Sequence, residues 1–209
     1  YFMGLVVERK EEERFLALGR VLEELVLYAT HLGLASCWIG GVFDRKGFAA
    51  QLGIAPEEDL PVVVALGHAA ERRSLADRVT RWGSKGDKRK APQELFRYED
   101  ASPACPEELR QPIQEALSLA RLAPSASNRQ PWRVVVDGRV LHLFLKRDSL
   151  YQKLMPQVDL QMVDMGIFLS HLELGLRHHG MPYQITHTPQ SPPEKDWSFL
   201  FSLKVGDLE

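Results

Sequence analysis

Hydrophobic positions recur with a helical spacing at both ends of the chain. Between residues 14 and 33 one apolar stripe repeats every three or four positions, formed by Leu18, Val21, Leu22, Leu25, Ala29 and Leu32. Gly33 follows it, as is typical of a helix C-terminus. The stretch from about Val158 to His179 is equally apolar and is closed by Gly180. Both stretches are therefore predicted to be long helices, and the stripe of the first is predicted to be buried.

The middle of the chain combines a helical pattern with strand patterns. A helix is expected from Pro106 to about Leu122, with Pro112 inside it as a potential break. The run from Pro61 to Gly67 is rich in valine and bounded by Pro and Gly, which predicts an interior strand. Residues 133–145 alternate in the manner of a β-hairpin, and we expect Asp137-Gly138 to form its two-residue turn.

Composition indicates an ordinary folded protein without a strong overall electrostatic field. The 209 residues are 44% hydrophobic and 26% charged, and the net charge of -2 gives nucleic acid or an anionic membrane no general attraction. Residues 72–97 differ, with nine Lys or Arg against three acids, and are predicted to be a basic arm or linker. Nucleic-acid binding by this arm is disfavoured because it offers little aromatic stacking surface besides Trp82.

The two cysteines and the first residues bear on the protein's surroundings. Cys37 and Cys105 lie far apart and form no C-x-x-C motif, so we expect reduced thiols in a cytoplasmic protein. No apolar run is long enough to cross a bilayer, and no membrane association is expected. Because the chain begins with Tyr-Phe, it is expected to be a fragment that lacks upstream residues.

The two terminal helical patterns match one another at an offset of 147 residues. The matched pairs are Gly19 and Gly166, Leu22 and Leu169, Leu25 and Leu172, Leu27 and Leu174, His31 and His178, and Gly33 and Gly180. This similarity predicts an internal duplication, with two α+β halves that imitate a dimer. The first half would then be shorter than the second by about 42 residues at its N-terminus.

Two short segments follow neither the helix period nor the strand period. The segment APSASNRQPW (123–132) is therefore predicted to be a shaped loop that holds a ligand, although Ser125 and Asn128 could instead bond within their own turn. In CWIGGVF (37–43), paired glycines would let the backbone approach a flat ligand, or would only turn the chain. Trp38 is expected to pack in the core.

Together, APSASNRQPW, CWIGG, LPVVVALG and KRKAPQ resemble the nitroreductase-like family of FMN flavoproteins, in the order found in its fused, single-chain members. The resemblance implies an α+β fold of two intertwined halves, each with a long central helix and an antiparallel or mixed sheet. The halves would be residues 1–97, including the basic arm, and 98–209. They would form one compact pseudo-dimeric unit, present as a monomer or homodimer.

The resemblance also implies a site, which is divided between the two halves. FMN would be lined by Pro124, Ser125, Ala126 and Asn128, would meet backbone donors near its N5 atom at Gly40 and Gly41, and would bind its phosphate through Lys88, Arg89 and Lys90. The alternative for Lys88, Arg89 and Lys90 is that they belong to a solvated linker. The chain departs from the family's pattern in two ways. No R-x-S-x-R segment is present, and Gly40 stands where many relatives carry an acid.

The implied activity is reduction of nitro compounds, quinones or similar acceptors by NAD(P)H, without a catalytic side chain or a metal. The alternatives are a flavin-binding protein without turnover and a different flavin reaction on the same scaffold. Other polar residues indicate no separate site. His178 and His179 are adjacent on a helix and point about 100° apart, and Asp159 and Asp164 are explained by helix capping or packing.

Overall fold

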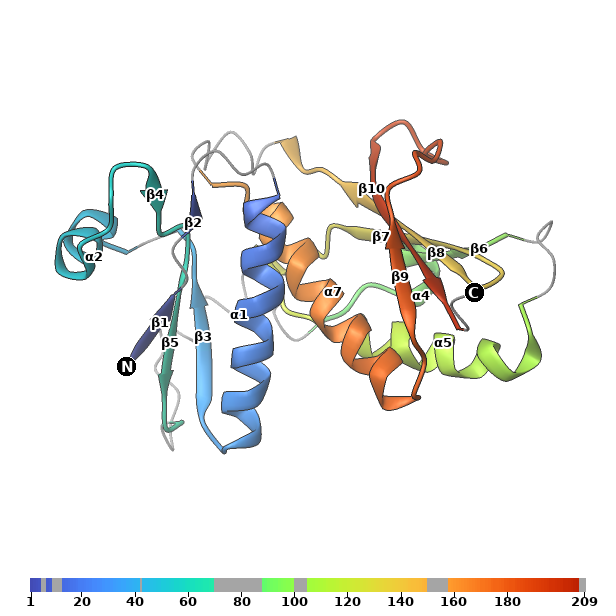
Figure 1. Ribbon diagram of the computed structural model, residues 1–209, viewed down its shortest axis with the longest axis horizontal. Helices are drawn as coiled ribbons and strands as arrows, with labels where there is room; N and C mark the ends of the chain where they lie inside the picture. The colour runs from blue at the N-terminus through green and yellow to red at the C-terminus, as the bar shows by residue number, and fades with distance from the viewer. Residues whose placement is uncertain are drawn as a thin grey trace.

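The computed structural model describes residues 1–4, 7–8, 13–41, 43–69, 88–99, 105–149 and 158–206. Figure 1 shows two β-sheets on either side of two long helices, α1 and α7. In chain order the elements are β1 (Phe2–Gly4), β2 (Val7–Glu8), α1 (Arg14–His31), β3 (Ala35–Ile39), α2 (Arg45–Leu52), β4 (Glu58–Asp59), β5 (Val63–Gly67), α4 (Pro92–Leu95), β6 (Phe96–Tyr98), α5 (Glu107–Ala120), η1 (Ala126–Asn128), β7 (Trp132–Asp137), β8 (Val140–Lys146), α7 (Leu160–His178), β9 (Tyr183–Thr186) and β10 (Trp197–Val205).

The two larger sheets confirm a mixed α+β fold. The first has the order β1-β5-β3 and is antiparallel, with β5 in the centre, so the run Pro61–Gly67 does contain an interior strand. The second has the order β6-β7-β8-β10-β9, in which β6 pairs parallel to β7 and the other pairs are antiparallel. A small third pairing joins β2 and β4.

The predicted hairpin is present, but its turn lies one residue further on. Asp137 pairs with Val140, so Gly138 and Arg139 form the turn. Gly138 has a φ of 58°, a left-handed conformation that glycine adopts without a steric penalty. The prediction of Asp137-Gly138 was wrong because the strand pairing extends through Asp137.

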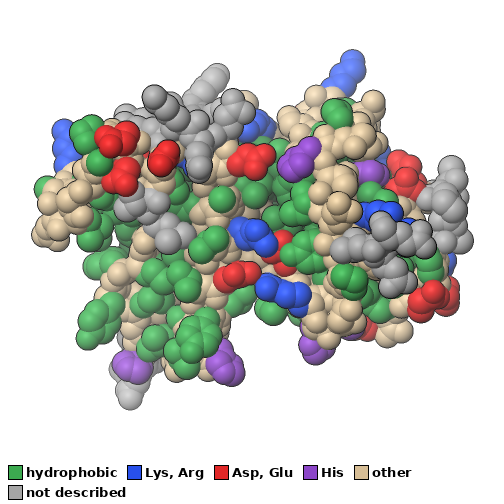
Figure 2. Space-filling model, viewed as in Figure 1, with side chains coloured by type: hydrophobic (Ala, Val, Ile, Leu, Met, Phe, Trp, Pro, Cys, Tyr) green, Lys and Arg blue, Asp and Glu red, His purple; other side chains and the backbone are tan. Residues whose placement is uncertain are grey.

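Helix α1 confirms the first helical prediction, although its buried face differs from the predicted stripe. Leu18 and Leu22 are buried as expected, whereas Val21, Leu25 and Leu32 are 46%, 41% and 59% exposed. The helix is apolar on more than one side, and only the side that includes Phe15 and Val26 joins the core. Figure 2 shows hydrophobic side chains gathered over the lower part of α1 and the neighbouring first sheet.

Helices α5 and α7 also form where they were predicted. Pro112 lies inside α5 and does not interrupt it. Asp159 caps the start of α7 by accepting a hydrogen bond from the Met162 N–H at 3.1 Å, which confirms its predicted capping role. Beyond the end of α7, Gly180 has a φ of 64°, the left-handed conformation typical of a helix C-terminus.

The crossing of α1 and α7 depends on two glycines. A Cβ atom at Gly19 would lie 2.1 Å from the Val163 carbonyl oxygen, and one at Gly166 would lie 2.1 Å from the Leu16 carbonyl oxygen. Gly19 therefore faces the carbonyl group of Val163, which lies three positions before Gly166. Gly166 faces the carbonyl group of Leu16, which lies three positions before Gly19. The contact is reciprocal, and it lets the two helix backbones touch.

Ion pairs continue this contact on the outer side of the two helices. Arg20 Nε lies 2.7 Å from the buried Glu173 carboxylate, and Arg177 Nη2 lies 2.9 Å from Glu24 Oε1. Figure 2 shows basic and acidic side chains interleaved in the middle of the molecule, over α1 and α7.

The predicted basic arm is only partly a connecting segment. Residues 72–87 of it lie outside the described ranges. The linker prediction is wrong for residues 92–97, because they form α4 and most of β6, and Arg97 pairs with Glu194 at 2.9 Å. The expected division between residues 97 and 98 falls inside β6, a strand that belongs wholly to the second sheet.

Candidate functional site

The loop after α5 has a rigid and unusual backbone. Ser127, Asn128 and Gln130 have φ values of 49°, 55° and 49°, a left-handed conformation that costs a non-glycine residue about 1–2 kcal/mol. Such strain persists only where the surroundings hold it in place. The segment APSASNRQPW is thus a shaped loop, as its lack of periodicity predicted.

Side chains of the loop itself supply part of this restraint. The Ser125 hydroxyl accepts a hydrogen bond from the Gln130 N–H at 2.9 Å. Asn128 Oδ1 accepts from Gln130 Nε2 at 3.0 Å, and Asn128 Nδ2 donates to the Lys88 carbonyl oxygen at 2.8 Å. The alternative that the side chain bonds the backbone of its own turn is therefore realised for Ser125, whereas the Asn128 side chain bonds the backbone of Lys88, 40 positions away.

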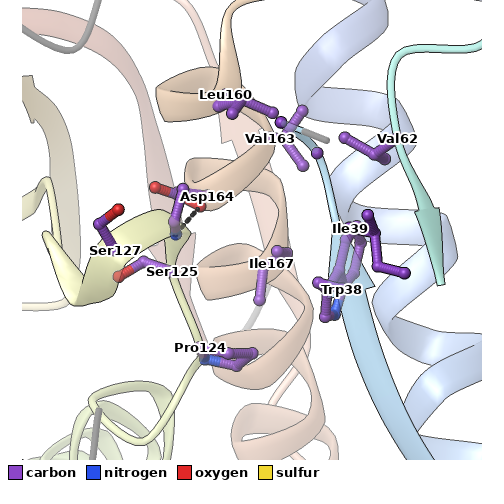
Figure 3. A pocket seen from close by; sticks show the side chains of 13 residues that line it. Trp38, Ile39, Val62, Pro124, Ser125, Ser127, Leu160, Val163, Asp164 and Ile167 are labelled. Atoms are coloured by element: carbon purple, nitrogen blue, oxygen red, sulfur yellow. Dashed lines mark hydrogen bonds between the residues drawn. The ribbon is translucent and has the colours of Figure 1, made fainter. Parts of the chain in front are cut away.

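The loop also encloses a cavity of about 460 Å³ together with the first sheet and α7. We term it the central cavity. The loop contributes Pro124, Ser125, Ala126 and Ser127; the end of β3 and the following turn contribute Trp38, Ile39, Gly40 and Gly41; the rest of the wall is Val62, Leu160, Val163, Asp164 and Ile167. Figure 3 shows these side chains converging from the loop, β3 and α7. Two segments more than 80 positions apart in the sequence thus face one space.

Gly40 has a packing reason to be glycine. A Cβ atom there would lie 2.9 Å from Leu160 Cδ2 and 3.3 Å from Val62 Cγ1, both of which line the central cavity. Its carbonyl oxygen accepts a hydrogen bond from Arg45, which also bonds the Pro61 carbonyl oxygen at 3.0 Å. The glycine turn is therefore fixed in place, and a side chain at residue 40 would press on two residues of the cavity wall.

Trp38 has a different position from the one expected. It packs against the core but also lines the central cavity, and its indole N–H donates to the buried Glu23 carboxylate at 3.0 Å. Glu23 in turn lies 2.8 Å from His171 Nε2. This chain of contacts from α7 through α1 fixes the orientation of the indole ring.

Asp164 is the one acidic side chain among the described residues that line the central cavity. It is 2% exposed, and its Oδ1 accepts a hydrogen bond from the Ala126 N–H at 2.9 Å (Figure 3). Oδ2 is buried and has no hydrogen-bond partner in the described parts of the chain. Burial raises the pKa of Asp164 well above its ordinary value, and Asp159 adds to the shift. The carboxyl group thus anchors the loop to α7, and its burial favours the neutral form.

The predicted phosphate-binding run lies beside the loop rather than in the central cavity. Arg89 donates to the Leu122 carbonyl oxygen at 3.0 Å, and the Lys90 ammonium donates to the Arg129 carbonyl oxygen at 2.7 Å. Neither these residues nor Lys88 and Asn128 are part of the described cavity wall. Of the expected cofactor-binding residues, the fold brings five to the central cavity: Gly40, Gly41, Pro124, Ser125 and Ala126.

Sequence reasoning missed the contributions of Trp38, Asp164 and the apolar residues of α7. Leu160, Val163 and Ile167 repeat at helical spacing and are indistinguishable from core positions in the sequence. The one available signal was the acid at residue 164 in the middle of an apolar run, since unpaired acids are rarely buried.

Comparison with known proteins places the chain in a family. Residues 1–176 match the family model described as "Putative TM nitroreductase". The chain belongs to this nitroreductase family. A segment of 75 residues is 37% identical to the "Probable NAD(P)H nitroreductase PigM" of Serratia sp. strain ATCC 39006. That segment covers 34% of this chain and only 21% of the relative.

The nitroreductase assignment agrees with a solved structure. A crystal structure of a "putative nitroreductase" from Thermotoga maritima MSB8 superimposes with a TM-score of 0.58 and 24% sequence identity, and covers 94% of this chain and 67% of the other. At this identity the match shows a shared fold. None of the described helices has the length and apolarity needed to span a membrane.

Proposed function

We propose that this nitroreductase-family protein is an NAD(P)H-dependent oxidoreductase that binds FMN in the central cavity and reduces nitro compounds, quinones or similar acceptors. One observation carries the proposal: the paired glycines and the loop at 124–127 line the same cavity. Its volume of about 460 Å³ lies within the range of about 300–1,000 Å³ typical of ligand pockets.

The wall chemistry suits a flat, largely apolar ring. Val62, Val163 and Ile167 offer aliphatic surface, and Gly40 and Gly41 contribute backbone without a side chain. Asp164 adds one buried oxygen without a partner in the described residues. These features fit an isoalloxazine ring, which has apolar faces and polar edges. When bound, FMN would supply hydride and electron transfer, chemistry that protein side chains lack.

The protein's own task is then to position reactants and exclude water. Apolar residues and the anchored loop give the cavity a fixed shape, which lowers the entropic cost of bringing two reactants together. The raised pKa of Asp164 favours the neutral form of its carboxyl group, which can donate a hydrogen bond as well as accept one. The proposal assigns no proton-transfer step to a side chain.

We propose that Lys88, Arg89 and Lys90 approach the FMN phosphate from the side of the loop. Ammonium and guanidinium groups are the usual phosphate ligands in proteins. Hydrogen bonds join this run to the loop, since Asn128 bonds Lys88 and the Lys90 N–H donates to Gln130 Oε1 at 2.9 Å. The three cations therefore sit next to the segment that lines the cavity.

We also propose that the protein consists of two duplicated halves that imitate a dimer. The reciprocal contact at the helix crossing supports this idea, because Gly19 and Gly166 are 147 positions apart, as are Leu16 and Val163. If a twofold axis relates α1 to α7, both pairs of equivalent residues must have the same separation in the sequence. The proposed division places the glycine turn in one half and the loop in the other.

A pair of glycine variants tests FMN binding. In Gly40→Val, the new side chain would displace Leu160 and Val62 in the wall of the central cavity, and we expect at least a tenfold loss of FMN affinity in a fluorescence titration. Gly67→Val is the matched control, because no atom lies within 4 Å of a Cβ atom at that position in β5. Equal FMN affinity in both variants, or no FMN binding by the wild type, would refute the cavity assignment.

Turnover is tested separately with the FMN-loaded protein. Under anaerobic conditions, NADH or NADPH should bleach the flavin absorbance, and a nitroaromatic compound or a quinone should restore it. Tight FMN binding without bleaching by either nicotinamide would favour a binding protein without turnover. Bleaching without reoxidation by these acceptors would favour another flavin reaction.

A further inference from the structure

Arg45, the first residue of α2, reaches back to the glycine turn at the wall of the central cavity. Its guanidinium donates to the Gly40 carbonyl oxygen at 2.5 Å and to the Pro61 carbonyl oxygen at 3.0 Å. Gly40 lines the central cavity, and Pro61 precedes Val62, which lines it too. Arg45 itself is not part of the described cavity wall, and Figure 1 shows α2 at the outer edge of the molecule, beyond the first sheet as seen from α7. Arg45 therefore supports this wall from behind.

The guanidinium group is held in one position. Asp44 caps the start of α2 by accepting a hydrogen bond from the Gly47 N–H at 3.0 Å. The central carbon of the guanidinium lies 4.6 Å from the centre of the Phe43 ring, a cation–π contact. Two carbonyl oxygens, a helix cap and an aromatic ring thus fix the place of this charge.

The charge of Arg45 is not neutralised by a neighbouring acid. In the parts of the chain that the structure describes, no carboxylate lies within 4.0 Å of its guanidinium. Its Nε atom is buried and has no hydrogen-bond partner there either. Charges that leave water are normally paired with an opposite charge. The positive charge therefore acts on the two backbone carbonyl groups that it bonds.

The direction of this bond decides where the next N–H group points. The Gly40 carbonyl group and the Gly41 N–H belong to one peptide unit, and the described chain contains no cis peptide bond. In a trans peptide the two groups point in opposite directions. Because the carbonyl group points to Arg45, the Gly41 N–H points away from Arg45, on the side where Gly41 lines the central cavity. Among the described residues this N–H has no acceptor.

A charged donor on the carbonyl oxygen also changes the N–H at the other end of the peptide. Hydrogen bonds from ionised groups are roughly twice as strong as those between neutral groups. Linked hydrogen bonds polarise one another, so a carbonyl group that accepts from a cation makes its peptide N–H a stronger donor.

We propose that Arg45 is a positioning residue of the central cavity, which aims the Gly41 N–H at the bound ring and strengthens it as a donor. This inference rests on the proposed function. Hydride brings two electrons and one proton, so its addition to a neutral ring leaves one negative charge there. A donor that is aimed in advance at such a charge stabilises it without any rearrangement of the protein. Arg45 would then favour binding of the reduced ring over the oxidised ring.

The first experiment compares the affinities of the protein for reduced and oxidised FMN. In Arg45→Met we expect the ratio of reduced to oxidised affinity to fall at least tenfold, which corresponds to a two-electron potential lower by about 30 mV. Arg45→Lys keeps a charged donor and should stay within about threefold of the wild-type ratio. Lys46→Met is the matched control, because it removes an exposed cation from the next residue of α2.

The lysine variant keeps this experiment decisive. Arg45→Met also loses the bond to the Pro61 carbonyl oxygen, so the turn could loosen and FMN binding could fail. Circular dichroism establishes that each variant is folded. An Arg45→Met protein that binds FMN with the wild-type ratio would overturn the proposal. A tenfold lower ratio in Arg45→Lys would overturn it as well, because the charge is retained there.

The second experiment observes the Gly41 N–H directly. In protein labelled with nitrogen-15 glycine, FMN should slow hydrogen exchange of the Gly41 amide at least tenfold. In the flavin-free protein, Arg45→Met should shift the Gly41 amide signal, and Lys46→Met should leave it in place. FMN binding by the wild type without any change in Gly41 exchange would remove this inference alone. Absence of FMN binding by the wild type would instead remove the proposed function.

Discussion

Replacement of Asp164 by alanine should release the loop that forms one wall of the central cavity. The Asp164 carboxyl group joins α7 to the loop through its hydrogen bond from the Ala126 N–H at 2.9 Å. Alanine cannot accept this bond. The Ala126 N–H would then be left partly buried without a partner, or the loop would have to move to find one.

The expected cost follows from these contacts. A buried N–H without a partner costs about 1–3 kcal/mol. The strain at Ser127, Asn128 and Gln130, at about 1–2 kcal/mol each, favours relaxation of the loop once its anchor is gone. We therefore expect Asp164→Ala to lower the free energy of unfolding by about 1–3 kcal/mol. If the loop relaxes, FMN affinity should fall by about five- to 150-fold, because about 1.4 kcal/mol corresponds to a factor of ten.

Asp164→Asn is the matched control. Its side-chain oxygen can still accept the bond from Ala126, so FMN affinity should stay within a few-fold of the wild type. The stabilities of the wild type and of Asp164→Asn should also depend differently on pH. Because the folded protein raises the pKa of Asp164, the contribution of the acid is complete below its ordinary pKa and is lost as the pH rises above it. Asp164→Asn should therefore gain stability relative to the wild type between about pH 5 and about pH 8.

The assays are urea unfolding at the two pH values and FMN titration followed by flavin fluorescence. Wild-type stability and wild-type FMN affinity in Asp164→Ala would contradict the anchoring role. A stability difference between wild type and Asp164→Asn that does not change with pH would contradict the neutral carboxyl group.

Three further predictions concern the helix crossing, the tryptophan and a tyrosine. Gly166→Ala would place a Cβ atom 2.1 Å from the Leu16 carbonyl oxygen, so we expect a loss of about 3 kcal/mol or more in urea unfolding; a loss below 1 kcal/mol would show that the helices can separate freely. Trp38→Phe removes the indole N–H that bonds Glu23, and should cost about 1–3 kcal/mol of stability; an unchanged unfolding midpoint would count against that bond. Burial and the hydrogen bond to Glu173 raise the pKa of Tyr183 to about 12, so its stabilising contribution should be complete below about pH 10 and be lost above it. A phenolate absorbance titration of wild type and Tyr183→Phe checks this shift, and an ordinary tyrosine pKa in the difference curve would refute it.

The proposed site residues could be predicted from the sequence only where their pattern was unusual. The loop at 123–132 attracted notice because Pro, Asn and Gln interrupt every regular period, and the structure confirms its fixed shape. Leu160 and Ile167 could not be recognised, because an apolar residue that lines a cavity has the same helical spacing as one in the core. The exposed Val21 and Leu25 were misjudged for a related reason: periodicity identifies an apolar face without revealing whether anything covers it.

The sequence by itself determined the local elements: the long helices, the interior strand, the hairpin and the loop between α5 and β7. Their causes lie within a few residues, in spacing, capping and backbone preference. Only the tertiary structure decided that Gly40 and Ser125 face one cavity and that Asp164 anchors the loop. These contacts join positions more than 30 residues apart, and the packing of α1 against α7 and of the loop against α7 sets them. Local patterns contain no information about such distances.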